Sequence, residues 1–438
     1  MPARKRLFNR GFVALLFTQF FGAVNDNLLK GVLSFAVAAG GLWANRLGEG
    51  GQGYVGLCLT LPFIVLSGLA GQLADRGSKR TITVIVKAAE IGIALIGLWA
   101  FVSGNLWLGL TAMLALAIQS AFFGPAKYGM IPELVGDRDL SQANGTINMA
   151  TNIAVIAGTL AAGPIYTLMD PASAKAPGAV EPLPAAVPSA PGIALLAVAV
   201  AGMAASLFLP KLAAMDPGLR FDWNPFRQYW HTLRDMAKGS LLLVAAAWAF
   251  FYMIGMIAIL VLPDYRELLG VSPTKASYLL GALGVAIGIG SVAAGLISGK
   301  HIEPRLIPVG AAGMTVFFAL LGTLPLKFGL VMALIAGAGL FAGFYIVPLQ
   351  ALLQHLSPAD ERGRFLGTAN AMSFVASTLG SIIFLVARSR AELPSNRVFL
   401  ICAGLALIGT GVLVWRLRKL IADPSLRHAD DADDAPES

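Results

Sequence analysis

The chain has 438 residues, of which 57% are hydrophobic and 13% are charged, and its mean hydropathy is +0.73. Soluble domains carry roughly 25% charged residues, so this composition leaves too little polar surface for a protein surrounded by water. The net charge of +8 would suit a nucleic-acid partner, but the basic residues lie between long apolar runs. Composition therefore excludes a soluble enzyme and argues against a nucleic-acid-binding protein.

Twelve apolar runs follow one another along the chain, each long enough for a helix to cross about 30 Å of hydrocarbon. They lie near residues 11–39, 53–73, 81–102, 106–126, 144–169, 191–210, 239–262, 276–299, 304–325, 329–353, 365–387 and 397–415. Lipid offers no hydrogen-bond partner to an exposed strand edge, so we predict helices. The first run follows a basic segment, as in a secretory signal, but it is too long for one, and we predict a retained first span.

The first run contains the polar residues Asn25, Asp26 and Asn27, with Lys30 one turn further on. A carboxylate within a membrane helix costs several kcal/mol unless it faces a cavity or a partner, so Asp26 is a candidate functional residue. In a purely structural alternative, Asp26 and Lys30 pair with each other, because they are four residues apart. The flanking asparagines favour a wet patch that faces a ligand, and we predict that all four side chains bind substrate.

The loop after the second run reads GQLADRGSKR, residues 71–80. It resembles the G-x-x-x-D-R-x-G-x-K/R-R/K signature of the major facilitator superfamily, with one residue fewer between Arg76 and the basic pair, and indicates an architecture and a gate rather than a substrate. The alternative is an ordinary basic loop. We expect Gly71 to allow close helix packing, Asp75 to cap or pair at a helix interface, and the basic residues to hold the loop at the cytoplasmic surface. The predicted gating motif comprises Gly71, Asp75, Arg76, Gly77, Lys79 and Arg80.

Charged residues also occur in the third run and at the end of the fourth. Lys87 and Glu90 are three residues apart, and we expect them to neutralise each other while Lys87 reaches toward the cytoplasmic surface. In FFGPAKYG, we expect Gly124 and Pro125 to break the helix and leave Lys127 at its cytoplasmic end. A lone lysine there would satisfy the helix dipole or the charge bias of loops. The surrounding Gly, Pro, Lys and Glu residues favour a role in substrate binding.

Two short matches between the halves recur at offsets of 224 and 222 residues, which favours a duplicated six-helix unit. They pair Tyr54 and Gly71 with Tyr278 and Gly295, and Gly145-Thr146-x-Asn148 with Gly367-Thr368-x-Asn370. We predict an all-α polytopic membrane protein of the major facilitator fold, with twelve transmembrane helices in two halves related by pseudo-two-fold symmetry. Its parts are an N-terminal half (1–210), an amphipathic cytoplasmic linker (211–238), a C-terminal half (239–416) and an acidic, disordered cytoplasmic tail (417–438).

Lysine and arginine placement orients the chain. With the N-terminus assigned to the cytoplasm, the segments on that side hold 22 of these residues and the opposite loops hold 8. This positive-inside bias predicts a multi-pass protein of the bacterial inner membrane with both termini in the cytoplasm and basic loops against anionic lipid. Cys58 and Cys402 lie in apolar runs as small hydrophobic residues. We predict no catalytic residue, no metal and no cofactor.

Several motifs resemble the lysophospholipid transporter family within the major facilitator superfamily. They are FFGAVNDNLLK in the first run, FFGPAKYGMIPELV after the fourth, and GFYIVPLQALLQHLSPADERGRFLGTANAM in the second half. Nearly the whole chain is similar to the transporter domain that some bacteria fuse to a 2-acyl-glycerophosphoethanolamine acyltransferase and acyl-carrier-protein synthetase. The resemblance implies a flippase that moves lysophospholipids, such as lysophosphatidylethanolamine, from the outer to the inner leaflet for reacylation. Asp26 matches the acidic position of the family, and Lys127 matches the lysine of its P-A-K-Y-G motif.

The sequence departs from some relatives, which carry an arginine in the seventh span, because residues 240–262 hold no charge. The resemblance further implies a monomer that works by alternating access, and a separate acyltransferase or acyl-carrier-protein synthetase as partner. Two alternatives stay open. One is a proton-coupled drug exporter of the same superfamily with Asp26 as its protonation site, and the other is a membrane partner of an acyltransferase that transports nothing.

Overall fold

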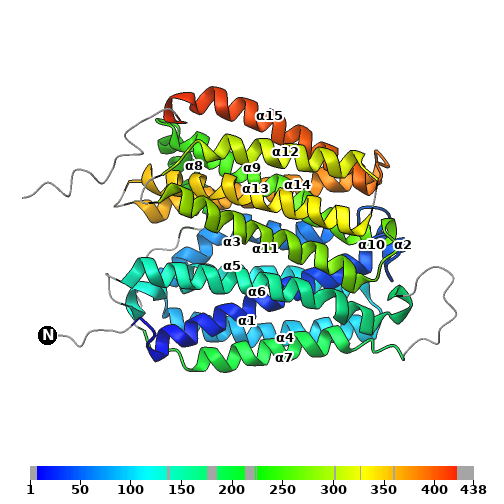
Figure 1. Ribbon diagram of the computed structural model, residues 1–438. Helices are drawn as coiled ribbons and strands as arrows, with labels where there is room; N and C mark the ends of the chain where they lie inside the picture. Colours follow the sequence, from blue (N-terminus) through cyan, green and yellow to red (C-terminus); the bar gives the residue numbers. More distant parts are fainter. Residues whose placement is uncertain are drawn as a thin grey trace, which may run out of the picture. The chain divides into compact units, whose positions relative to one another are not determined.

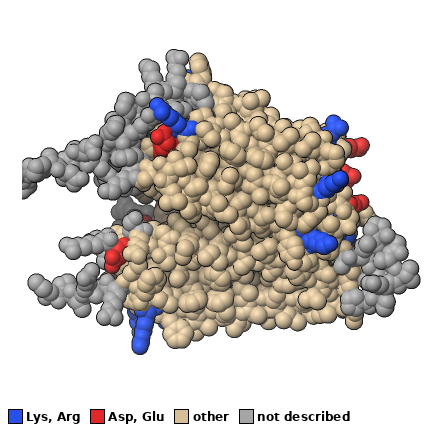
Figure 2. All heavy atoms as spheres, in the orientation of Figure 1, with Lys and Arg blue, Asp and Glu red and all other residues tan. Residues whose placement is uncertain are grey.

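The computed structural model describes residues 7–135, 139–174, 185–212, 222, 224–299, 302–325, 327–358 and 361–421 (Figure 1). Twelve helices in this part of the chain are long and apolar enough to cross a membrane. On the face shown in Figure 2, charged side chains gather near the helix ends and the middle of the helices is uncharged. The prediction of an all-α protein with twelve spans is confirmed. Of the predicted acidic tail, residues 422–438 lie outside the described residues.

The first six spans begin and end close to the predicted apolar runs. They are α1 (Arg10–Val37), α3 (Gln52–Arg76), α4 (Lys79–Val102), α5 (Leu106–Leu134), α6 (Leu140–Met169) and α7 (Ala190–Leu207), with the short helices α2 (Ala44–Leu47) and η2 (Pro171–Ala174) between them. Asparagine side chains fix two of the starts, since Asn9 accepts from the backbone N–H of Phe12 at 3.0 Å and Asn105 accepts from that of Trp107 at 3.0 Å. Such caps satisfy backbone donors that the first turn of a helix leaves free.

The remaining spans follow the helix α8 (Pro225–Met236), which lies in the predicted linker. They are α9 (Leu241–Val261), extended by η3 (Leu262–Asp264) and α10 (Tyr265–Leu268), then α11 (Pro273–Ser298), α12 (Leu306–Thr323), α13 (Phe328–His355), α14 (Arg362–Ser389) and α15 (Ser395–Ile421). One side of α8 buries Thr232 and Met236, while Phe226 and Trp230 are exposed. This helix therefore has one buried side and one exposed side, as we expect of an amphipathic linker.

Close contacts divide the chain into two compact units. The first unit comprises Met1–Gln228 and Gly270–Gly281, and the second comprises Tyr229–Leu269 and Ala282–Ser438. The change from one unit to the other falls inside α8, and the first turns of α11 belong to the first unit. The boundary thus falls within the predicted linker, and each unit has its own set of packed helices.

Small residues let the helices of the first unit approach closely. A Cβ atom added to Gly31 of α1 would lie 2.5 Å from Cβ of Ala162 in α6, and one added to Gly158 would lie 2.5 Å from the Val24 carbonyl oxygen. A Cβ atom on Gly192 of α7 would similarly collide with Leu98 of α4. Helices in lipid gain from close packing rather than from burial away from water, so these glycines set which helices pair.

The second unit repeats this pattern of pairing. Its first and fifth spans, α9 and α14, meet where Gly380 approaches the Met253 carbonyl oxygen, just as α1 meets α6. Its third span, α12, packs on α13 and α15, as α4 packs on α5 and α7. Two units that pair their helices in the same order are what a duplicated six-helix sequence would produce.

Helix α5 corrects one prediction from the sequence. Gly124 and Pro125 do not break it, because the helix continues through both Pro125 and Pro132 to Leu134. A proline removes one backbone hydrogen bond, and neighbouring helices allow a membrane helix to tolerate that loss. Lys127 therefore lies within the fourth span, about two turns before its end, and does not belong with the loop residues.

Candidate functional site

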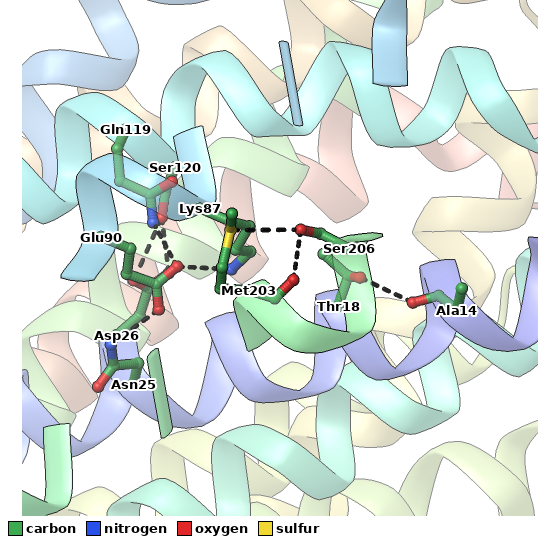
Figure 3. Close-up of polar contacts among 10 residues, drawn as sticks. All are labelled: Ala14, Thr18, Asn25, Asp26, Lys87, Glu90, Gln119, Ser120, Met203 and Ser206. Carbon is green, nitrogen blue, oxygen red and sulfur yellow. Dashed lines mark hydrogen bonds and ion pairs between the residues drawn. The ribbon is translucent and has the colours of Figure 1, made fainter. Parts of the chain in front are cut away.

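Asp26 of α1 faces α5, as Figure 3 shows. The hydroxyl of Ser120 in α5 donates to the Asp26 carboxylate, at 2.9 Å to Oδ2 and 3.2 Å to Oδ1. Lys30 instead donates to Oδ1 of Asn27 at 2.7 Å, and no ion pair among the described residues joins Asp26 to Lys30 within 4.0 Å. Asp26 and Lys30 therefore do not form the direct ion pair of the structural alternative.

A fully buried cluster surrounds the Glu90 carboxylate beside this contact (Figure 3). Glu90 Oε2 lies 2.6 Å from Lys87 Nζ and accepts from Gln119 Nε2 at 3.1 Å, while Oε1 accepts from Asn25 Nδ2 at 2.7 Å. The expected pairing of Lys87 with Glu90 is confirmed. The expectation that Lys87 reaches the surface is wrong, because both side chains are 0% exposed. Partners on α1 and α5 satisfy charges that would otherwise be too costly to bury.

Space for the Lys87 ammonium comes from a glycine on the neighbouring helix. A Cβ atom added to Gly22 of α1 would lie 2.5 Å from Lys87 Nζ. The ammonium also lies 5.1 Å from the ring centroid of Phe123 in α5, within the range of a cation–π contact. A small residue on α1 therefore leaves space for this charge, and an aromatic residue on α5 contacts it.

Lys127 is the substrate-binding residue predicted on α5. Its side chain is 7% exposed, and its ammonium lies 4.3 Å from the ring centroid of Tyr128. Among the described residues, none of the ion pairs within 4.0 Å includes Lys127. Lys127 follows Ser120 by seven residues, which places both on one face of α5, roughly 10 Å apart along the axis. The face of α5 that meets Asp26 thus also carries a buried cation.

The substrate-binding residues predicted on α1 have different environments. Asp26 is half-buried against α5, and Asn25 is buried in the Glu90 cluster. Asn27 donates to the Ala23 carbonyl oxygen at 2.9 Å and accepts from Lys30. Sequence reasoning did not assign Ser120 or Gln119 to the site. The signal that could have identified them is a pair of polar residues in an apolar run, one of them two helical turns before Lys127.

The predicted gating motif connects α3 to α4. Lys79 is buried and its Nζ lies 2.5 Å from Glu133 Oε1 at the end of α5, while Arg80 Nε donates to the Leu209 carbonyl oxygen at 2.8 Å. Asp75 and Arg76 are exposed at the end of α3. Among the described residues, a Cβ atom added to Gly71 would meet no atom within 4 Å. Gly77 ends α3 in an extended conformation.

The second unit holds its buried charges near helix ends. Arg388 Nε of α14 lies 3.3 Å from Asp264 Oδ2, which also accepts from Ser395 at 2.7 Å. At the end of α8, Asp235 accepts from Lys238 at 2.7 Å and from Arg364 at 3.0 Å. The Lys238 hydrogen bond, with the charges of Lys238 and Arg364, lowers the pKa of Asp235 below its ordinary value.

No group of three His, Cys, Asp or Glu side chains suited to a metal occurs among the described residues.

Comparison with known proteins defines the class first. A family model described as Major Facilitator Superfamily matches residues 12–381 and 244–434. A solved structure titled as a POT family transporter in complex with 5-aminolevulinic acid superposes with a TM-score of 0.71 at 12% identity, covering 96% of this chain and 99% of that chain. The fold is that of a multi-pass membrane transporter of this superfamily.

Sequence relatives define the family more narrowly. The chain is 31% identical over 382 residues to the lysophospholipid transporter LplT of Cronobacter sakazakii, with 84% of each protein covered. It is 29% identical over 386 residues to the protein of that name from Yersinia enterocolitica, covering 85% of this chain and 84% of the relative. The chain belongs to the lysophospholipid transporter family of the major facilitator superfamily.

Proposed function

We propose that the protein moves lysophospholipids, such as lysophosphatidylethanolamine, from the outer to the inner leaflet of the bacterial inner membrane for reacylation. The observation that carries this proposal is a pair of opposite charges within the spans, Asp26 on α1 and Lys127 on α5. Neither forms an ion pair within 4.0 Å among the described residues. The names of the relatives support the same substrate class.

The two charges suit the two ends of a zwitterionic head. A lysine ammonium binds phosphate as a compact point charge, which is the role assigned to Lys127. Asp26, with its carboxylate already oriented by Ser120, receives the ammonium of ethanolamine. Asn27 directly follows Asp26 on α1 and Lys30 lies one turn further on, and both add polar contacts to the head. An ionisable residue kept within a membrane span is functional by default, because its burial is costly.

Transport follows from alternating access between two six-helix halves, with the α3–α4 connection as part of the cytoplasmic gate. Lys79 and Arg80 anchor this connection to α5 and to the chain after α7, which leaves Asp75 and Arg76 exposed for contacts during the cycle. The positive-inside bias supports cytoplasmic termini. The carrier acts as a monomer, and a separate acyltransferase or acyl-carrier-protein synthetase consumes the lipid that it delivers.

Uptake of labelled lysophosphatidylethanolamine into spheroplasts tests the proposal. Asp26→Asn and Lys127→Ala each remove one charge from the site, and we expect each to lower the uptake rate by about tenfold or more, since a hydrogen bond to a charged group contributes about 1.5–3 kcal/mol. Lys275→Ala, at the exposed start of α11, is the matched control and should transport like the wild type. Wild-type uptake by both site variants would refute the assignment. Drug sensitivity of a deletion strain with normal lysolipid recycling would favour an exporter instead.

A further inference from the structure

The Glu90 carboxylate lies where three helices of the first unit meet. It receives three donors, Lys87 from its own helix α4, Asn25 from α1 and Gln119 from α5. None of these three residues is more than 5% exposed, and Glu90 itself is 0% exposed. A carboxylate enclosed in this way does not contact a substrate that enters through lipid or water. Its role therefore lies in the side chains that donate hydrogen bonds to it.

The residues that Glu90 holds are each adjacent to a residue of the candidate site. Asn25 precedes Asp26 on α1, and Gln119 precedes Ser120 on α5. Asn25 and Gln119 both donate to Glu90, and Ser120 donates to Asp26. Helices α1 and α5 are thus joined twice, once through Glu90 and once directly (Figure 3). Successive residues of a helix point about 100° apart, so a rotation of α1 by one residue would break both connections.

Charge explains why the residue at this position is a glutamate. An ionised carboxylate accepts more than one strong hydrogen bond at the same time, as it does here from Asn25, Gln119 and Lys87. Lys87 balances the charge, and Gly22 leaves room for the ammonium. Among the described residues, Asn25 Oδ1 and Gln119 Oε1 have no hydrogen-bond partner, so both amides are oriented only through their nitrogen atoms.

We infer that Glu90 is a positioning residue of the transporter, which acts through Asn25 and Gln119 to hold Asp26 and Ser120 toward each other for headgroup binding. The inference rests on the proposed function, since it assigns Glu90 an effect on lysolipid affinity. It assigns Lys87 the role of ion-pair partner to this buried carboxylate. Neither residue contacts the lipid.

A pair of charge-balanced double variants separates positioning from charge burial. Lys87→Met with Glu90→Leu removes both charges and every acceptor at position 90. Lys87→Met with Glu90→Gln also removes both charges, but its amide oxygen still accepts from Asn25, and its amide nitrogen can donate to the free Gln119 Oε1 after that amide turns over. The measurement is the Kd for labelled lysophosphatidylethanolamine of the purified protein in nanodiscs. The thermal unfolding midpoint of each variant is measured alongside.

A double-mutant cycle with Asp26→Asn then shows whether Glu90 acts through Asp26. We expect the Leu double variant to raise Kd by about tenfold or more, and the Gln double variant to stay within about threefold of the wild type. In the Asp26→Asn background, the Leu double variant should change Kd by less than about twofold, because the residue it positions is already impaired. An equal effect in both backgrounds, or no effect of the Leu double variant, would overturn the inference.

A milder variant decides the question if the Leu double variant does not fold. Gln119→Leu removes one donor and no charge, and its matched control is Thr111→Ala on the same helix, where the hydroxyl donates to the Trp107 carbonyl oxygen one turn earlier. We expect Gln119→Leu to weaken binding by about threefold or more in the wild-type background and not in Asp26→Asn, with Thr111→Ala unchanged. Equal effects in both backgrounds would again reject positioning. If Asp26→Asn itself binds like the wild type, the proposed function and this inference both fail.

Discussion

The spans of the first unit carry charges within their length, and those of the second unit carry theirs near their ends. Asp26, Lys87, Glu90 and Lys127 all lie inside α1, α4 or α5. The buried pair of the second unit, Asp264 and Arg388, lies at the end of one span and near the end of another. Although the units pair their helices in the same order, they differ in where they hold charge.

This difference supports the proposal that the first unit recognises the polar headgroup. Charges in the middle of a span are retained only where partners or a ligand compensate their burial. Glu90 has such partners inside the protein, whereas the carboxylate of Asp26 is held by one hydroxyl and Lys127 has an aromatic neighbour. We therefore assign headgroup recognition to the first unit, and the absence of charge from residues 240–262 agrees with that assignment.

The largest effect is expected where one charge of the buried pair is removed alone. Glu90→Leu leaves the Lys87 ammonium without its carboxylate in a place that is 0% exposed, and we expect a loss of about 3–5 kcal/mol in stability. Thermal unfolding in detergent or nanodiscs measures it. The double variant with Lys87→Met, which leaves no unpaired charge, is the control and should recover most of the loss. Equal unfolding of Glu90→Leu and the wild type would contradict the buried placement of Lys87.

A smaller effect is expected from crowding the same ammonium. Gly22→Ala places a Cβ atom 2.5 Å from Lys87 Nζ, so the ion pair has to shift, at a cost of about 1–3 kcal/mol. Gly71→Ala is the matched control, because its added Cβ atom meets no atom of the described residues within 4 Å. Unfolding midpoints compare the two. If Gly71→Ala proved the more damaging variant, the space around these glycines would not be as described.

The smallest effect is expected in the second unit, at the half-buried Asp235. Its pKa is lowered by the Lys238 hydrogen bond and by the charges of Lys238 and Arg364, so its ionised form stabilises the folded protein above the unfolded-state pKa of aspartate. That contribution is lost as the pH falls through the lowered pKa. Asp235→Asn should therefore melt slightly below the wild type at neutral pH and together with it in acid. A difference that grows in acid would contradict the sign.

Much of the fold could be predicted from the sequence, because span length and apolar composition report directly on the thickness of a bilayer. The α5 helix shows the limit of that reasoning. Gly124 and Pro125 predict a break, yet the surrounding helices keep α5 continuous to Leu134. Whether a proline ends a membrane helix depends on tertiary neighbours, which the local sequence does not contain.

The candidate site could be predicted only in part, because its charged residues are visible in the sequence but its contacts between helices are not. Asp26 and Lys127 are visible as charges in apolar sequence, and Lys87 and Glu90 are visible as a pair by their spacing. The hydrogen bonds between helices are not visible in the sequence. Ser120 and Asp26 are 94 positions apart, Asn25 and Glu90 are 65 apart, and Gln119 and Glu90 are 29 apart. Spacing along one helix predicts neighbours on that helix, and contacts between helices need the structure.

Flipping of defined lysolipids by the purified protein in liposomes tests the central claim most directly. The assay compares lysophosphatidylethanolamine with its diacyl form, in the wild type and in Asp26→Asn and Lys127→Ala. We predict transfer of the lysolipid between leaflets by the wild type, with a rate about tenfold or more lower in each variant, from the loss of one charged contact. Equal rates in the wild type, both variants and protein-free liposomes would contradict the account.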